Sequence, residues 1–214
     1  MTGHPGGPVD PWSLREHTEE YLAEDDVLLS ARATATTRGC APVGPAAGAG
    51  LRFLAATISA RAVVEIGTGA GVSGLWLLRG MSQDGVLTSI DIDPENLRVA
   101  RTAFTAAGHG PSRLRLINGM GLEVLPRLTD GGYDLVFIDT DPADHPRYLE
   151  EAVRLLRTGG IVVLDDALAA GAPDANGAAP VTLREAARQV RADDRLVPML
   201  LPLGNGLLAA VKTA

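Results

Sequence analysis

Three acidic residues that end two apolar runs in the second half of the chain could carry chemistry. Asp139 ends the run YDLVFID, and Asp165 and Asp166 end the run GIVVLDD. If these runs are neighbouring parallel strands, their backbones lie about 4.8 Å apart and the carboxylates meet at one edge of a sheet. Such like charges disfavour joint ionisation unless a cation neutralises them, and Mg²⁺ prefers oxygen ligands of this kind. The pattern therefore predicts a divalent metal site, with a helix cap and two solvated turn residues as the alternative.

A glycine-rich loop follows an earlier apolar run in VVEIGTGAGVSG, residues 63–74. Gly67, Gly69 and Gly71 let the backbone turn sharply and approach a ligand, and the start of the following helix favours polar or anionic groups. The next apolar run ends in Asp91, where an acidic side chain can accept hydrogen bonds from both hydroxyls of a ribose. In an open α/β sheet, ligands bind beyond the carboxyl ends of the strands, so these residues predict a cofactor site there.

Two classes of cofactor compete for this loop. A dinucleotide site expects the pattern GxGxxG, but Val72 stands at the position of the third glycine. The chain also leaves little length for the substrate domain of a dehydrogenase, and it contains no YxxxK pair of a short-chain dehydrogenase. The GTGAG pattern with Glu65 instead resembles motif I of the class I methyltransferases, which bind S-adenosylmethionine (SAM).

The resemblance extends over about residues 40–212 and is to the small O-methyltransferase family that includes catechol and caffeoyl-CoA O-methyltransferases, in the style of its actinobacterial members. It implies that Asp91 and Ile92 hold the ribose and adenine of SAM, and that the segment NGMGLEVL lies at the adenine edge. Ser73 could instead be only a helix N-terminal residue, and Met120 only a core residue. The full set of implied cofactor-binding residues is Val43, Glu65, Gly67, Thr68, Gly69, Ser73, Asp91, Ile92, Gly119 and Met120.

The same resemblance implies a metal site with two departures from the family pattern. Asp139 and Asp165 match the family's metal ligands, whereas Asp166 stands where Asn is usual. The lysine that usually serves as the base is replaced by Pro142, which cannot take a proton. His145 is then a candidate base with a near-neutral pKa, although a histidine in a loop can also be plain polar surface. A tyrosine of the family corresponds to Tyr148, a candidate for the substrate cleft or for packing against the sheet.

The implied function is the transfer of a methyl group from SAM to a hydroxyl of a small, catechol-like acceptor, assisted by Mg²⁺ or another divalent cation. Asp139 and His145 are the candidate catalytic residues, and Asp139, Asp165 and Asp166 the candidate metal ligands. The alternative is a protein that binds SAM with weak or lost catalysis and acts as a sensor or partner, which Pro142 and Asp166 motivate. The family also implies a homodimer, with the N-terminal helix as a plausible contact surface.

Short apolar runs alternate with helical patterns after Arg61, which is typical of β-α-β units. Expected strands lie at 62–67, 86–91, 113–117, 133–139 and 160–165, and two more form a hairpin around Gly204–Gly206. Expected helices lie at 14–35 and 46–59. With the resemblance, this predicts a Rossmann-like α/β fold: a seven-stranded, mostly parallel sheet with a C-terminal antiparallel hairpin and helices on both faces. Residues 1–11 are expected to be a flexible lead-in, 167–180 a surface loop, and 12–214 a single methyltransferase domain, with helices 12–59 as an appendage to the core, 61–214.

Composition excludes several other classes of protein. The 214 residues are 46% apolar and 21% charged, which rules out disorder. A net charge of −7 without a basic run argues against nucleic acid as a partner. One cysteine, Cys40, excludes an internal disulfide framework. No apolar stretch is long enough for a membrane span, and no secretory leader is visible, so a soluble cytoplasmic protein is expected.

Overall fold

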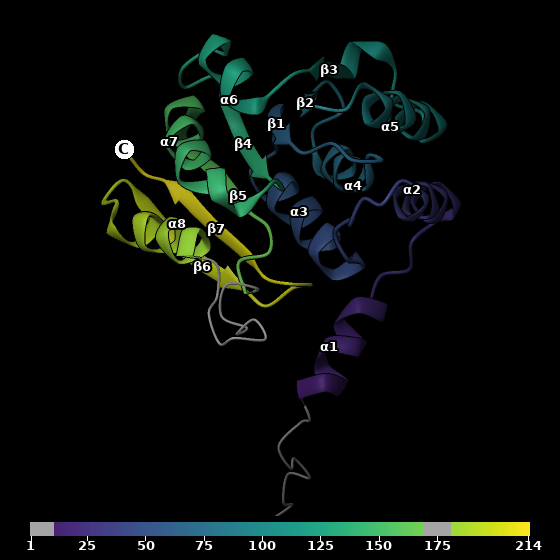
Figure 1. Cartoon of the computed structure of the whole chain (residues 1–214), viewed down its shortest axis with the longest axis horizontal. Coiled ribbons are helices and arrows are strands. Elements are labelled where there is room, and N and C mark those ends of the chain that lie inside the picture. Colours follow the sequence, from purple (N-terminus) through teal and green to yellow (C-terminus); the bar gives the residue numbers. More distant parts are fainter. Residues whose placement is uncertain (1–10, 169–180) are drawn as a thin grey trace, which may run out of the picture.

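A seven-stranded sheet forms the centre of the computed structural model, which describes residues 11–168 and 181–214 (Figure 1). Its strand order is β3-β2-β1-β4-β5-β7-β6, and β7 runs antiparallel to both β5 and β6 while the other pairs are parallel. The predicted mostly parallel sheet with a C-terminal hairpin is thereby confirmed. The strands are β1 (Ala62–Ile66), β2 (Val86–Asp91), β3 (Leu114–Asn118), β4 (Tyr133–Ile138), β5 (Leu156–Leu164), β6 (Leu196–Leu201) and β7 (Leu207–Lys212).

Helices pack on both faces of this sheet (Figure 1). Successive side chains of a strand point to opposite faces, so Val63 packs in one apolar cluster with α2 to α5, and Val64 packs in another with α6 to α8. The α-helices of the described residues are α1 (Pro11–Glu20), α2 (Asp26–Thr37), α3 (Pro45–Thr57), α4 (Val72–Gly80), α5 (Pro94–Ala106), α6 (Gly121–Val124), α7 (His145–Leu155) and α8 (Val181–Ala192). None of them has the length and hydropathy of a membrane span.

The N-terminal helices differ from the prediction in their bounds. The expected helix at 14–35 is wrong, because the chain breaks after Glu20 and a new helix begins at Asp26. Asp25 caps this new helix by accepting a hydrogen bond from the Leu28 amide at 3.1 Å, a position that favours Asp. The helices α2 and α3, predicted as an appendage, pack closely on the sheet, because Leu28 and Leu51 are fully buried in the same cluster as β1. Burial against the sheet makes both helices part of the core.

Two expectations concern segments that the structure leaves undescribed. The lead-in 1–11 lies outside the described residues except for Pro11, which begins α1. The expected surface loop 167–180 lies outside them from residue 169 onward.

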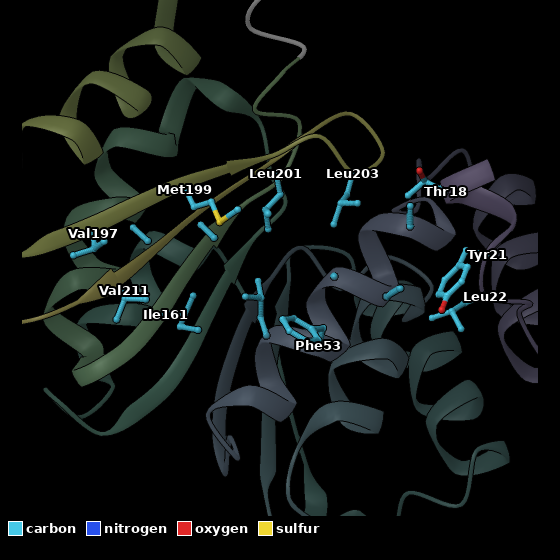
Figure 2. A pocket seen from close by; sticks show the side chains of 16 residues that line it. Thr18, Tyr21, Leu22, Phe53, Ile161, Val197, Met199, Leu201, Leu203 and Val211 are labelled. Atoms are coloured by element: carbon cyan, nitrogen blue, oxygen red, sulfur yellow. The ribbon is translucent and has the colours of Figure 1, made fainter. Parts of the chain in front are cut away.

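An apolar groove of about 500 Å³ lies where β5, β6 and β7 face α1 and α3. Figure 2 shows Val197, Met199 and Val211 on one side of the groove and Tyr21 on the other, with Phe53 between them. Among the described residues that line it, none is charged. Tyr21, Phe53 and Met199 are 76%, 70% and 62% exposed, which is unusual for large apolar side chains grouped together.

Candidate active site

The order in which successive strands are added to the sheet reverses between β1 and β4. The site lies at the carboxyl ends of these two strands. β2 follows β1 on one side of it, whereas β4 lies on the other side, so the loops after β1 and β4 diverge there. Ligands of open α/β sheets bind at such a switch point. A Cβ on Gly67 would lie 1.9 Å from the carbonyl oxygen of Asp139, and the φ of Gly67 is +95°. The close approach of the two loops therefore requires glycine at this position.

Two cavities meet at this switch point. The loop cavity, about 280 Å³, lies between the glycine loop and residues 40–42, and its wall includes Thr68, Ser73 and Asp139. The edge cavity, about 230 Å³, lies between the end of β2 and the N-terminal part of α7. Three residues line both cavities, namely Gly67, Asp91 and Thr140. Together the cavities reach the size range of about 300–1,000 Å³ that is usual for small-molecule sites, so one elongated ligand can occupy both.

Glu65 lies behind the loop cavity and does not line it. The carboxylate is fully buried and accepts hydrogen bonds from the hydroxyls of Ser73 at 2.6 Å and Ser89 at 2.5 Å. Burial raises its pKa to about 7, against the lowering effect of the two serines. Ser89 in turn lies 2.6 Å from the hydroxyl of Thr68. Glu65 thus fixes Ser73 and Thr68, which do face the cavity.

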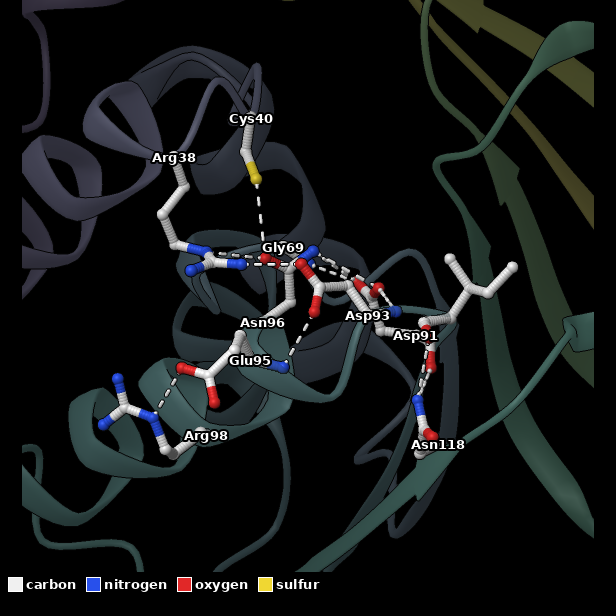
Figure 3. A network of polar contacts seen from close by, with 10 residues as sticks. Arg38, Cys40, Gly69, Asp91, Asp93, Glu95, Asn96, Arg98 and Asn118 are labelled. Atoms are coloured by element: carbon white, nitrogen blue, oxygen red, sulfur yellow. Dashed lines mark hydrogen bonds and ion pairs between the residues drawn. The ribbon is translucent and has the colours of Figure 1, made fainter.

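Asp91 ends β2 on the wall shared by the cavities, where a ribose-binding carboxylate was predicted. One oxygen accepts a hydrogen bond from the Gly69 amide at 2.9 Å, and the other accepts one from the Asp93 amide at 2.8 Å. Asn96 donates to both oxygens at 3.2 Å (Figure 3). The side chain is therefore held in one orientation before any ligand arrives.

Two exposed apolar side chains flank the edge cavity. Ile92 is 70% exposed and Met120 is 50% exposed, so the interpretation of Met120 as a core residue is wrong. Gly119 lies beside them on the same wall, and Tyr148 lines the cavity from α7 while packing in the core cluster beneath it. An apolar, planar ligand group such as a nucleobase fits between surfaces of this kind.

Not every predicted cofactor residue reaches a cavity. Val43 is 4% exposed and packs in the core, whereas its neighbours Cys40, Ala41 and Pro42 form the wall of the loop cavity. Thr140, which no sequence motif singled out, lies at the site with a buried hydroxyl that has no hydrogen-bond partner among the described residues. Its position directly after the strand-ending Asp139 was the available signal.

The predicted metal ligands lie at the ends of β4 and β5, which are held together by a hydrogen bond from the Asp165 amide to the Ile138 carbonyl at 3.0 Å. No described residue donates a hydrogen bond to the Asp139 carboxylate, and burial followed by the charge of Asp165 raises its pKa well above the usual value. Burial also raises the pKa of Asp165 to about 6. Asp166 has a φ of +57°, which Asp and Asn tolerate better than most residues, and it accepts a hydrogen bond from Asn205 at 3.1 Å.

These carboxylates fit a divalent cation only in part. The described residues contain no group of three or more acidic, histidine or cysteine side chains placed to hold a metal ion, so the three-carboxylate arrangement is not preformed. Asp139 and Asp165 nevertheless offer hard oxygen donors whose mutual repulsion a cation would relieve, and Mg²⁺ often uses only one or two carboxylates.

His145 begins α7 and is 1% exposed, so the expectation of a polar surface residue is wrong. Its Nε2 lies 3.0 Å from the carbonyl oxygen of Thr140, and a carbonyl can only accept, so Nε2 carries the proton. Nδ1 has no partner among the described residues, and burial lowers the pKa of the ring. His145 lines neither the loop cavity nor the edge cavity, so a role as base stays a prediction.

A cofactor cavity at the switch point of a seven-stranded sheet that ends in an antiparallel pair defines a Rossmann-like class I methyltransferase fold. The chain belongs to the O-methyltransferase family, whose sequence model matches residues 18–213. A protein of Mycobacterium bovis named as an O-methyltransferase is 55% identical over 99% of this chain and 96% of its own.

Solved structures agree with this assignment. A crystal structure from Corynebacterium glutamicum is 33% identical, with a TM-score of 0.87 over 95% of this chain and 97% of its own. The O-methyltransferase TomG of Streptomyces achromogenes, involved in tomaymycin synthesis and solved in complex with SAM, is 26% identical, with a TM-score of 0.82 over 94% of this chain and 96% of its own.

Proposed function

We propose that this chain transfers the methyl group of SAM to a hydroxyl of a small, catechol-like acceptor with the help of a divalent cation. The observation that carries this proposal is the pair of adjoining cavities, with Asp91 on their shared wall and Asp139 on the wall of the loop cavity. A ribose at Asp91 puts the amino-acid part of SAM in the loop cavity and its adenine in the edge cavity. The binding of SAM by TomG, a relative with the same fold, supports this cofactor.

The reaction needs alignment more than reactive groups. The bond from the acceptor oxygen to the methyl carbon forms as the bond from that carbon to sulfur breaks, and the proton of the acceptor hydroxyl passes to a base or to solvent water. The products are a methyl ether and S-adenosylhomocysteine (SAH). A rigid cofactor site supplies much of the required orientation. When ionised, Asp139 accepts a hydrogen bond from the acceptor hydroxyl and orients its oxygen.

Asp139 and Asp165 are the residues that would hold a divalent cation in this proposal, with Asp166 as a further ligand if it leaves Asn205. A cation held by these residues would lower the pKa of a coordinated acceptor hydroxyl, and this would compensate for the missing lysine at Pro142. His145 stays a candidate for proton transfer. His145→Gln, which keeps a donor for the Thr140 carbonyl, should reduce turnover without changing SAH binding if the prediction holds.

The first experiment is a calorimetric titration of SAH into the protein, with Mg²⁺ and with a chelator. We expect micromolar binding in both and a separate Mg²⁺ heat that Asp139→Ala removes. Asp194→Asn, which changes an exposed carboxylate outside both cavities, is the matched control. Absence of SAH binding by the wild type would overturn the cofactor assignment. Absence of a heat of Mg²⁺ binding would overturn the proposed role of a divalent cation.

A turnover assay with catechol and hydroxycinnamoyl acceptors separates the enzyme from a protein that only binds SAM. Methylation that Asp139→Ala reduces at least about a hundredfold is expected, since orientation and charge stabilisation are lost together. SAH binding without methylation of any such acceptor would favour a sensor or partner.

The net charge of −7 supports a small molecule over nucleic acid as the partner, and the single cysteine supports a reducing, cytoplasmic compartment.

We also propose that two copies of the chain pair through the apolar groove. Phe53 and Tyr21 line the groove and are largely exposed, so a twofold axis can place the aromatic rings of each copy against the groove of the other. The uncharged lining suits two chains that each carry a net charge of −7. The edge strand β6 contains Pro198, which cannot donate a hydrogen bond and so disfavours pairing edge to edge.

Light scattering after size exclusion tests the pairing. The wild type should have the mass of a dimer, and Phe53→Glu should have that of a monomer. Leu29→Glu changes a 52% exposed apolar residue outside the groove and should leave the dimer intact. A monomeric wild type would contradict the pairing.

A further inference from the structure

A chain of polar contacts connects the end of α2 to the carboxylate of Asp91 (Figure 3). Arg38, the C-cap residue of α2, donates from Nε to Oδ1 of Asn96 at 2.8 Å and from Nη2 to Oδ2 of Asp93 at 2.6 Å. Asn96, in the first turn of α5, donates from Nδ2 to both oxygens of Asp91. Neither Arg38 nor Asn96 lines the loop cavity or the edge cavity, so any effect on a ligand there passes through Asp91.

Arg38 determines which way the amide of Asn96 points. An amide has an accepting oxygen on one side and a donating nitrogen on the other, whereas a guanidinium only donates. Arg38 therefore holds the oxygen of Asn96 toward α2, and the thiol of Cys40 lies 3.8 Å from the same oxygen as a weak second donor. The nitrogen is left to face Asp91. Rotation of the amide would place an oxygen against the Asp91 carboxylate, which is repulsive.

Asn96 in turn determines the plane of the Asp91 carboxylate. The amides of Gly69 and Asp93 each hold one oxygen, and Asn96 contacts both. The two carboxylate oxygens offer about four acceptor sites and these donors face all of them, so fixing the plane decides how each oxygen is presented to a further donor that shares it. Asp91 is only 8% exposed, so water cannot readily replace a lost partner.

We propose that Arg38 and Asn96 are positioning residues for the cofactor ribose, and that they make this part of the site depend on the contact of α2 with α5. In this relay, which runs from Arg38 through Asn96 to Asp91, the Asn96 amide spans both carboxylate oxygens at 3.2 Å, and the ribose hydroxyls donate to the same two oxygens in the plane that Asn96 fixes. The inference rests on the proposed function, because it needs a ribose at Asp91. It adds that the end of α2 contributes to cofactor affinity without touching the cofactor.

The test measures the affinity of the full chain for SAH by calorimetry. Asn96→Asp keeps the shape of the side chain and an acceptor for Arg38 but turns a carboxylate toward Asp91, so SAH binding should weaken about tenfold or more. Arg38→Ala should weaken it about threefold, with Arg38→Lys in between, since Lys lacks the planar fork that reaches two partners. Arg98→Ala removes an exposed ion pair with Glu95 on the same helix and is the control with less than about a twofold change.

Two readouts separate positioning from a general structural role. The losses should disappear in an Asp91→Ala background, and they should be much smaller for the SAH analogue that lacks both ribose hydroxyls. If Asn96→Asp does not fold, Asn96→Ala carries the same comparison.

Equal losses in both backgrounds, or SAH affinity within about twofold of wild type for the Asn96 variants, would overturn the relay alone. A wild type that binds no SAH would overturn the proposed function and the relay with it.

Discussion

Asp91 and Asp139 lie at the same edge of the sheet but have opposite surroundings. Asp91 accepts hydrogen bonds from two backbone amides and from Asn96. Asp139 accepts none from the described residues, and burial, followed by the charge of the neighbouring Asp165, raises its pKa. The first carboxylate is satisfied before a ligand binds, whereas the second gains a favourable partner only from a cation or a hydroxyl. Under the proposed function, the fold alone prepares the cofactor side of the site, whereas the acceptor side is complete only with a bound cation or acceptor.

This difference lowers the free energy of unfolding only at the Asp139 side. A carboxylate with donors around it stabilises the folded state, while buried like charges without donors destabilise it. Functional sites often hold such destabilising groups because binding uses them. Four predictions test this contrast between the surroundings of Asp91 and those of Asp139.

The largest effect on stability and on SAH binding is expected at Gly67, where the glycine loop touches the loop after β4. Gly67→Ala would bring a methyl group to within 1.9 Å of the Asp139 carbonyl, so one of the loops must move. We expect a loss of about 3 kcal/mol or more in the free energy of unfolding and no SAH binding. Gly108→Ala, at a φ of +83° with nothing within 4 Å of the new methyl group, should cost only about 1 kcal/mol. Similar denaturation midpoints for the two variants would contradict the close approach.

Glu65 gives a pH-dependent effect of the next size. Its pKa is raised from 4.5 to about 7 in the folded protein, so the folded state binds a proton that the unfolded state has lost between these values. Its contribution to stability is therefore present below about pH 4.5 and falls by up to about 1.4 kcal/mol per pH unit as the pH rises to 7. Glu65→Gln should remove this part of the slope in chemical denaturation series from pH 4.5 to 8. Parallel slopes for the two proteins would show that Glu65 does not titrate there.

Asp91 and Asp139 should respond to the same substitution with opposite signs. Asp91→Asn places an amide nitrogen against existing donors and should destabilise the protein by about 2 kcal/mol. Asp139→Asn removes a buried charge and should stabilise it by about 1 kcal/mol in chelator at pH 8. Because the pKa of Asp139 is raised, that gain should shrink at low pH, where the wild-type group is protonated. If both variants changed the free energy of unfolding in the same direction, the contrast between the surroundings of Asp91 and Asp139 would be wrong.

The smallest effect is expected at the edge cavity. Ile92→Ala should weaken SAH binding about threefold through lost apolar contact with the adenine. Because Ile92 is 70% exposed, the melting temperature without ligand should not change. A lowered melting temperature would assign Ile92 to the core instead.

The sequence by itself determined the order of the strands along the chain and the edge of the sheet at which the site lies. Alternating apolar runs define the strands, because a parallel sheet covered on both faces needs side chains that are apolar on both. The residues after those strands, Gly67, Asp91, Asp139 and Asp165, were found for the same reason, since parallel strands bring their carboxyl ends to one edge. The break before α2 could have been read from Asp25, a favoured N-cap residue.

Only the tertiary structure decided what surrounds each of these residues. Val43 and Pro42 are adjacent in the chain, yet one is buried in the core and the other lines the loop cavity. His145 is buried at the start of α7, and Asn96 reaches Asp91 with its amide oriented by Arg38, 58 positions away. Hydrogen-bond satisfaction and burial depend on groups from distant segments, and no local pattern of residue types encodes them.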